Sequence, residues 1–410
     1  MQLNSQLLAS YTECQGTNGI YQNKDEVDVL KDLAKLRSAK DLIQYWGYPC
    51  EEHVAITADG YMLGLQRIPN RRRDSVCHTT SMPCNRASVI LWHGLAISSD
   101  VFVCNVTPKL NLALVLADAG YDVWLGNTRG NRYSRGHQTL DLSKRSDSLT
   151  YWDFSIDELA SFDITAAVDY VLSVTGHQQV SYIGFSQGAA QAFAALAVNN
   201  ELNGKIRIFV ALAPALKPQP IQSKAVMGIV RTLGPSFLFN ILGNKAFLPI
   251  ANHFHALLPS SVYAFIVQTA LQSLFGWKCD RFGPYTRRVA LYSRIFSDTS
   301  VKLVAHWFQI IHRRQFKPFQ ENKSMYIVHT SIDPSKTTQY YPTKHIETNM
   351  HLFCGGNDNI SDMAHMIKHL PSHTRIHTIP NYEHMDFIWA IDARKLVWEP
   401  VLDLLKGGCC

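Results

Sequence analysis

The stretch "SYIGFSQGAAQ", residues 181–191, contains the pattern G-x-S-x-G at Gly184, Ser186 and Gly188. An apolar run suited to a buried strand precedes the serine, and a run of small residues suited to a helix follows it. The pattern is typical of a sharp strand-to-helix turn that holds the serine at its apex, where the glycines let the flanking backbones approach closely. Because such short patterns also occur by chance, Ser186 becomes a candidate nucleophile only if the chain also supplies a base, an acid and an oxyanion hole.

Strand and helix patterns alternate from residue 88 to residue 214. Strands are expected at 88–94, 121–127, 180–186 and 206–214, and helices at 110–120, 155–176 and 187–199. Before them, two alternating runs over residues 51–69 meet at Ala58-Asp59-Gly60, which predicts a hairpin. The alternation predicts an α/β fold with a mostly parallel sheet flanked by helices on both faces.

The alternation stops at Pro214 and resumes at "MHLFCGGND" (350–358). The intervening residues are aromatic and helix-like; in "TSVKLVAHWFQIIHRRQ" (299–315), Val301, Val304, Phe308 and Ile311 share one helix face. We therefore expect a large, mainly helical cap inserted before the late strands. The expected division is a polar and helical extension at 1–41, the core at 42–214, the cap at 215–345, the second part of the core at 346–406 and a tail at 407–410.

The charge of the chain is concentrated in the cap. The net charge is +6, and residues 218–345 hold 15 lysines and arginines against 4 acidic residues. Such a segment is attracted to anionic surfaces, and a phospholipid surface fits better than nucleic acid because no nucleic-acid motif accompanies it. A basic face that is merely solvated is an equally good interpretation.

Targeting and metal-binding signals are missing from the sequence. No clean apolar run reaches the ~18 residues of a membrane-spanning helix, and the polar N-terminus does not resemble a secretory signal. Nine cysteines are scattered without C-x-x-C spacing. We therefore expect reduced thiols, no metal site, no cofactor and a cytoplasmic location.

Reactive residues follow four of the expected strands. Ser186, Asp358 and His384 occur in the order Ser, Asp, His that an α/β-hydrolase requires. His384 would take the serine proton, and Asp358 would orient the imidazole and stabilise the imidazolium. The backbone N–H groups of Leu95 and Gln187 would form the oxyanion hole.

Other histidines and carboxylates are weaker candidates. His93 follows a strand but fits the oxyanion turn better, Asp362 is expected inside a helix, and Asp386 lies two residues from His384. The remaining nearby histidines are expected to be surface or structural residues: His365, His369, His373 and His377.

Seven segments resemble the acid lipase family, and specifically its fungal steryl ester hydrolases. They are "HGLAISSDVF", "LADAGYDVWLGNTRGNRYS", "YWDFSIDELASFDI", "GFSQG", "TSVKLVAHWFQII", "CGGNDNISD" and "NYEHMDFIWAIDA", and the resemblance covers about residues 42–405. It places the nucleophile at Ser186, the acid at Asp358 and the base at His384. It also implies hydrolysis of steryl esters or triacylglycerols without metal or cofactor, in a hydrophobic tunnel under the cap.

The partner and location follow from the resemblance and from the cap. Family members act on water-insoluble esters, so we expect peripheral association with lipid droplets or membranes on the cytoplasmic side, and no nucleic acid. Apolar cap residues would enter the lipid while lysines and arginines meet head groups. Cys409 and Cys410 at the C-terminus could be lipidated, or the tail could be unmodified.

Alternative functions remain open from the sequence. The sequence does not rank a steryl ester against a triacylglycerol as substrate. Aromatic residues of the cap would decide between these two esters; they are Phe237, Phe239, Phe265, Trp277, Trp307 and Phe308. A soluble esterase or thioesterase for small acyl groups would not need so large a cap. An inactive lipid-binding scaffold is disfavoured because Ser186, Asp358 and His384 are all present.

Overall fold

A computed structural model describes residues 26–69, 86–220, 222–234, 236–247, 257–320 and 340–407. The main sheet has the strand order β1-β2-β4-β3-β6-β7-β10-β11, with β5 paired to β2. Its strands are β1 (Glu51–Ile56), β2 (Tyr61–Ile68), β3 (Ser88–Trp92), β4 (Asp122–Gly126), β5 (Gly136–His137), β6 (Val180–Phe185), β7 (Ile206–Leu212), β10 (Asn349–Gly355) and β11 (Arg375–Ile379). A separate two-stranded sheet pairs β8 (Ala246–Phe247) with β9 (Thr299–Ser300).

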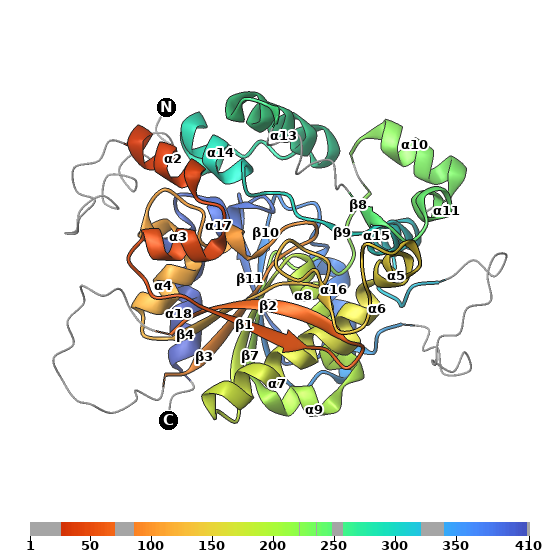
Figure 1. Cartoon of the computed structure of the whole chain (residues 1–410). Helices are drawn as coiled ribbons and strands as arrows, with labels where there is room; N and C mark the ends of the chain where they lie inside the picture. The colour runs from red at the N-terminus through yellow and green to blue at the C-terminus, as the bar shows by residue number, and fades with distance from the viewer. Residues whose placement is uncertain are drawn as a thin grey trace.

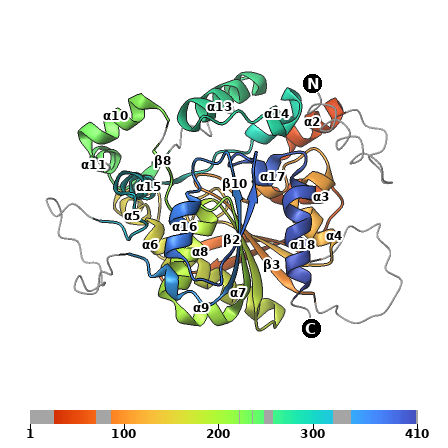
Figure 2. The same cartoon turned by 180° about the vertical axis from the view of Figure 1, so that it is seen from behind.

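Helices cover both faces of the main sheet (Figures 1 and 2). They are α2 (Glu26–Lys35), α3 (Ala39–Tyr45), α4 (Leu112–Asp118), α5 (Arg145–Tyr151), α6 (Ile156–Glu158), α7 (Ile164–Thr175), α8 (Gln187–Val198), α9 (Asn200–Lys205), α10 (Lys224–Leu233), α11 (Phe237–Leu242), α13 (Ser260–Phe275), α14 (Tyr285–Tyr292), α15 (Val301–Arg313), α16 (Met363–His369), α17 (Asp386–Trp389) and α18 (Glu399–Lys406). Within the described ranges, no helix combines the length and the apolar character needed to cross a bilayer.

The sheet confirms the predicted α/β fold. Strands β4, β3, β6, β7, β10 and β11 run parallel to one another. Strands β1 and β2 form the predicted antiparallel hairpin, and β2 also pairs antiparallel with β4. Successive side chains of β3 enter opposite layers: Val89 and Leu91 join the core with α3, α4 and α18, and Ile90 and Trp92 join the core with α7 and α8. This alternation is what a strand buried on both faces requires.

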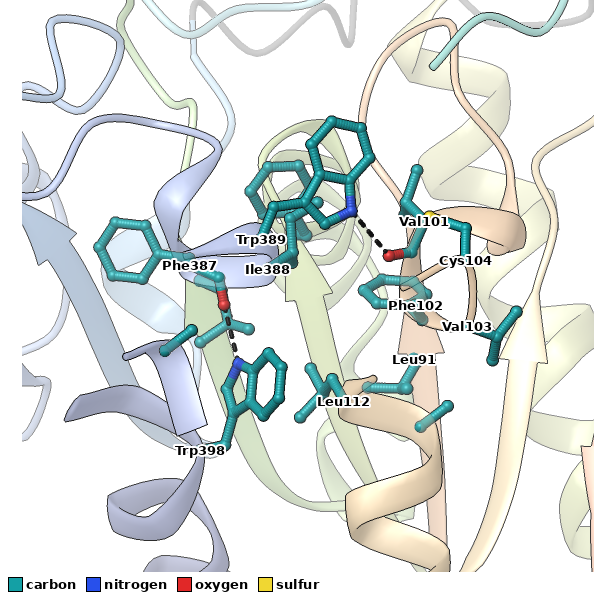
Figure 3. Close-up of a cluster of buried hydrophobic side chains, with 14 of the residues drawn as sticks. Leu91, Val101, Phe102, Val103, Cys104, Leu112, Phe387, Ile388, Trp389 and Trp398 are labelled. Atoms are coloured by element: carbon teal, nitrogen blue, oxygen red, sulfur yellow. Dashed lines mark hydrogen bonds between the residues drawn. The ribbon is translucent and has the colours of Figure 1, made fainter. Parts of the chain in front are cut away.

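Two tryptophans near the C-terminus hold the segment after β11 in place, and one of them bonds the segment after β3 (Figure 3). The indole N–H of Trp389 donates to the carbonyl of Val101 at 3.1 Å, and that of Trp398 donates to Phe387 at 2.8 Å. Both indoles are fully buried. The "HMDFIW" segment that follows β11 is therefore held rigidly, which matters because His384 begins it.

The long helix expected at 155–176 is interrupted. Ser155 caps its start through a capping box with Glu158, and Gly176 ends it with φ 71°, as the sequence predicts. Between them, residues Leu159–Asp163 form a π-helical turn that separates α6 from α7. The extra residue of a π turn has no clear sequence signature, so the prediction of one continuous helix was wrong here.

The chain leaves the main sheet after β7 and returns at β10. Helices α10, α11, α13, α14 and α15 come from this excursion and lie together along one side of the sheet, at the top of Figure 1. The expected boundaries of this cap, residues 215 and 345, stay predictions.

A buried arginine ties the loop after β4 to two other segments. The Arg129 side chain is fully buried; its Nε donates to Asp163 at 2.7 Å, and its two terminal nitrogens donate to Asp59 at 2.6 and 2.9 Å. Asp59 lies in the β1–β2 turn, and Asp163 ends the π turn. The guanidinium also lies 3.8 Å from the centroid of the Tyr61 ring.

We predict that Arg129→Leu lowers the free energy of unfolding by about 3–5 kcal/mol, because it leaves the carboxylate of Asp163 buried and unpaired. Urea unfolding followed by circular dichroism measures this. Lys205→Ala is the matched control, since the Lys205–Asp169 ion pair is also 2.7 Å long but exposed, and should cost less than about 1 kcal/mol. Equal effects of the two substitutions would contradict the assignment.

Candidate active site

Ser186 lies at the sharp turn between β6 and α8. Its backbone has φ 55° and ψ −115°, a strained conformation for a residue with a side chain. A Cβ atom at Gly188 would lie 2.4 Å from the carbonyl oxygen of Trp92, and one at Gly184 would lie 2.7 Å from the backbone nitrogen of Ala189. Both elbow positions therefore require glycine, and the turn can form only because β3 and α8 touch backbone to backbone.

Three buried side chains form a continuous chain of hydrogen bonds. The Ser186 hydroxyl lies 2.7 Å from His384 Nε2, and His384 Nδ1 lies 2.9 Å from Asp358 Oδ2. Ser186 follows β6, Asp358 follows β10 and His384 follows β11, so all three lie at the carboxyl edge of the sheet. With Asp358 accepting the Nδ1 proton, Nε2 is left as the nitrogen that can take a proton from the serine.

Asp358 is held by two further donors. Its Oδ1 accepts the backbone N–H of Ile360 at 2.8 Å, and its Oδ2 also accepts the Ser361 hydroxyl at 3.0 Å. Ser361 in turn lies 3.0 Å from the carbonyl of Pro214, at the end of the β7 region. These bonds fix the carboxylate while its second oxygen faces the imidazole.

Leu95 and Gln187 both line the pocket beside Ser186. Gln187 is the first residue of α8, where a backbone N–H has no acceptor within the helix and is available to a ligand. The indole N–H of Trp307, on cap helix α15, donates to the side-chain oxygen of Gln187 at 2.7 Å. A cap residue therefore fixes the orientation of this side chain.

The pocket over Ser186 is apolar. It has a volume of about 330 Å³, and among the described residues no aspartate, glutamate, lysine or arginine lines it. Its aromatic wall consists of Phe185, Phe247, Phe275, Trp277, Phe296, Trp307 and Phe308. Of the cap residues singled out in the sequence, Trp277, Trp307 and Phe308 line the pocket, whereas Phe237, Phe239 and Phe265 do not. Phe265 is 64% exposed, and Phe237 and Phe239 pack against other cap aromatics.

Two family models match the chain. The alpha/beta hydrolase fold matches residues 87–391, and the partial alpha/beta-hydrolase lipase region matches residues 39–106. A Schizosaccharomyces pombe protein named a probable lipase is 36% identical over 379 residues, which cover 92% of this chain and 78% of that protein. This chain belongs to the acid lipase family of α/β-hydrolases.

Two mammalian relatives are about equally similar to this acid lipase. Human gastric triacylglycerol lipase is 33% identical over 89% of this chain and 90% of its own. The lysosomal acid lipase/cholesteryl ester hydrolase of Macaca fascicularis is 32% identical over 90% of each chain. A crystal structure of a lipase candidate from Sulfolobus solfataricus covers 87% of this chain and 99% of its own, with a TM-score of 0.53 at 16% identity, which concerns the fold alone. The acid lipase is thus a carboxylic ester hydrolase of the lipase and esterase class.

His93 is a structural residue of the turn after β3 in this acid lipase. Its Nε2 accepts the backbone N–H of Thr128 at 3.1 Å and the side-chain amide of Asn131 at 3.0 Å. Its Nδ1 must therefore carry the proton, which it donates to the carbonyl of Gly94 at 2.8 Å. Complete burial lowers the pKa of His93 to about 4, so the ring is neutral and cannot readily serve as a base.

The alternative acids have other partners. The sequence analysis expected Asp362 inside a helix, but the residue lies just before α16. Its carboxylate pairs with Arg314 at 3.0 Å. Asp386 begins α17 and accepts the backbone N–H of Glu383 at 2.7 Å; burial raises its pKa to about 8. Neither carboxylate bonds His384, whereas Asp358 does.

The nearby histidines also lie apart from the serine. His377, in β11, faces His351 at 3.1 Å, and His373 lies 3.2 Å from the carbonyl of Thr348. His369 ends α16. The side chain of His365 lies outside the described residues. Among the described residues, no group of three potential ligands could hold a metal ion.

The structure adds aromatic contacts to His384 that the sequence did not reveal. The Trp277 ring stacks on the imidazole with a centroid distance of 5.1 Å and an interplanar angle of 14°. Its indole N–H donates to the Asn359 side chain at 3.1 Å, next to Asp358. Trp277 is 107 positions before His384 and belongs to the cap, so only the fold brings the two together.

We predict that Gly188→Ala abolishes soluble expression or lowers the unfolding midpoint severely, because the added methyl would overlap the Trp92 carbonyl. Thermal unfolding of the purified variants measures this. Gly204→Ala, on exposed helix α9 with no neighbour within 4 Å of the added atom, should be neutral or slightly stabilising. A folded, fully stable Gly188→Ala protein would argue against the elbow geometry.

Proposed function

We propose that this acid lipase hydrolyses neutral-lipid esters, steryl esters above all, through a covalent acyl-enzyme on Ser186. The observation that carries the proposal is the hydrogen-bonded chain Ser186–His384–Asp358 at the floor of a pocket with no charged wall. An uncharged, bulky ester suits such a pocket, because a charged substrate would lose its hydration without compensation.

The first half of the reaction acylates the serine. As Ser186 Oγ attacks the ester carbonyl carbon, His384 Nε2 takes its proton, and Asp358 stabilises the imidazolium. The negative charge on the carbonyl oxygen would be met by the N–H groups of Leu95 and Gln187. When the tetrahedral intermediate collapses, the C–O bond to the alcohol breaks and His384 returns the proton to the leaving alkoxide, so that sterol departs.

The second half releases the fatty acid. A water molecule gives its proton to His384 and attacks the acyl carbon, and the same donors hold the oxyanion. Collapse breaks the bond to Ser186 Oγ, which regains the proton from His384. The products are one alcohol and one fatty acid per ester, and no cofactor takes part.

The flat aromatic wall supports a steryl ester over a triacylglycerol. Trp277, Phe275 and Trp307 line the pocket with rigid aromatic rings that suit a rigid, flat alcohol, and Phe275 stacks on Trp277 at 4.5 Å. A glycerol backbone with two further chains is flexible and gains less from a preformed flat wall. Triacylglycerol hydrolysis is the alternative, because the gastric triacylglycerol lipase and the lysosomal acid lipase/cholesteryl ester hydrolase have about the same sequence identity to this chain.

We expect purified protein to release sterol and fatty acid in equal amounts from emulsified cholesteryl oleate, and Ser186→Ala to lower turnover by about a million-fold. Separate quantification of sterol and fatty acid in mixed cholesteryl oleate and trioleoylglycerol emulsions measures both. Fatty acid without sterol would assign the alternative, triacylglycerol hydrolysis. Activity retained by Ser186→Ala would refute the acyl-enzyme, and no turnover of either ester would favour the scaffold interpretation.

We also propose that the cap contacts the surface of a lipid droplet or membrane, on its cytoplasmic side. Ile241 of α11, Leu257 before α13 and Phe265 within α13 are 70%, 77% and 64% exposed, although all are large and apolar. Burial of such side chains in a lipid phase lowers their free energy, so these three residues support contact with a lipid surface.

Charge contributes less to this contact than the sequence suggested. Arg287 is fully buried and bonds Asn105 and the carbonyl of Trp389, while Lys302 pairs with Asp153 at 2.8 Å. Arg281 pairs with Asp392 and Arg314 with Asp362. These four of the fifteen lysines and arginines of residues 218–345 therefore have partners within the protein, and apolar contact supports the proposal more than head-group attraction.

We predict that the triple variant Ile241→Ser, Leu257→Ser, Phe265→Ser binds phospholipid-coated lipid droplets at least about tenfold more weakly, at a loss of roughly 1 kcal/mol or more per site. Flotation with artificial droplets measures binding, and hydrolysis of dissolved p-nitrophenyl butyrate should be unchanged. The matched control replaces Ile56, Val174 and Val198 by serine, since they are exposed and apolar but outside the cap. Equal loss in both triple variants would argue against a cap-specific contact.

A further inference from the structure

A second cavity lies beside the catalytic pocket. It is enclosed by helices α2, α13 and α14 and by the loop after β4, and its volume of about 1040 Å³ exceeds the 330 Å³ of the catalytic pocket. In Figure 1, α2 and α14 lie next to each other at the upper edge of the molecule. The mechanism described above makes no use of this cavity.

The wall of this cavity is positively charged. Lys35, Arg37, Arg132, Arg135 and Arg294 line it, and among the residues that the structure describes no aspartate or glutamate does so. Arg132 and Arg135 have partners in Asp100 and Asp298, and Arg294 donates to the carbonyls of Leu33 and Leu36 at the end of α2. Within the described part of the chain, the exposed Arg37 guanidinium has no such partner.

Most of the other residues that line this cavity are apolar. Leu30, Leu33 and Leu36 form a stripe along α2 and its end, and Val289 and Tyr263 face it from α14 and α13. A ligand that matches both the basic and the apolar lining residues carries one anionic group and a long hydrocarbon chain. The guanidiniums recognise a carboxylate through paired N–H donors, and the leucines bury the chain.

One short segment separates the two cavities. Ile295 lines the catalytic pocket, Arg294 lines the second cavity, and Phe296 lines both. The next residue, Ser297, donates its backbone N–H to the carbonyl of Ala96 at 2.8 Å, beside Leu95, and its hydroxyl accepts the N–H of Arg132 at 2.9 Å. Phe296, which is partly buried, is therefore the residue that the two linings share.

We propose that the second cavity binds the long-chain fatty acid released by the enzyme, with its carboxylate at Arg37 and its chain along α2. The inference rests on the proposed function, because hydrolysis changes the ligand from a neutral ester into an anion. A pocket without a charged wall disfavours that anion, whereas the neighbouring cavity stabilises it. Product would pass Phe296 and leave the catalytic pocket free for the next ester.

The test blocks the catalytic pocket covalently and then measures fatty-acid binding to the second cavity. Protein whose Ser186 has reacted with a hexadecyl fluorophosphonate is titrated with radiolabelled oleate, below its micelle concentration, by equilibrium dialysis. We expect one oleate per chain, at least about tenfold weaker binding of oleyl alcohol, and at least about tenfold weaker oleate binding by Arg37→Glu. Arg145→Glu, an exposed charge reversal away from both cavities, should bind oleate like the unmodified sequence.

Several results would overturn the inference. The first is that the blocked protein does not bind oleate. The second is that oleyl alcohol binds as tightly as oleate. The third is that Arg37→Glu binds oleate as tightly as the unmodified sequence. Binding to phosphatidylserine vesicles that Arg37→Glu abolishes, without binding of monomeric oleate, would instead assign the arginines to a membrane head group. If the fluorophosphonate adds no mass to the protein, the proposed function fails, and oleate binding by the Ser186→Ala protein with and without Arg37→Glu still tests the cavity.

Discussion

The contact between the backbones of β3 and α8 is the constraint on which the rest of the site depends. Gly188 lies against the carbonyls of Trp92 and His93, so the helix that begins at Gln187 starts directly beside the turn after β3. The strained φ of Ser186 is tolerated because the flanking strand and helix are buried on all sides. One close approach therefore places the Ser186 hydroxyl and both expected oxyanion donors around the same point in space.

The cap of this acid lipase is part of the site rather than a cover over it. Trp307 of α15 bonds the side chain of Gln187, and Trp277 stacks on His384 while bonding Asn359. These contacts join the cap to the nucleophile elbow and to the strand ends that carry the other two residues. A rearrangement of α13 or α15 would change the packing around His384 and the orientation of Gln187 together, so access to the pocket and the geometry of the reacting groups are linked.

The parts of the fold that could be predicted are those encoded locally. A turn or cap residue at a fixed offset marks the hairpin at Asp59, the elbow at Ser186 and the ends of the 155–176 helix. The sequence order of Ser186, Asp358 and His384 was also sufficient to select three residues that lie within hydrogen-bond distance of one another. Contacts between distant segments could not be predicted. The Arg129 network joins residues 104 positions apart, and its sequence signal is limited to ordinary charged residues. Side-chain direction was also inaccessible, since Phe265 faces solvent whereas Phe308 faces the pocket.

The neutral imidazole of His93 has a consequence for acidic surroundings. Its pKa of about 4 leaves the bonds to Thr128, Asn131 and Gly94 intact at any pH above that value, so the turn after β3 keeps its shape in an acidic organelle as well as in a neutral one. In the unfolded chain, His93 has an ordinary pKa near 6.5, so between about pH 6.5 and pH 4 it binds a proton that it does not bind in the folded chain. As pH falls from about 6.5 towards 4, this difference costs the fold up to roughly 3 kcal/mol. His93 thus preserves the hydrogen bonds of the turn after β3 in acid, but it lowers the free energy of unfolding of the whole chain as the pH falls.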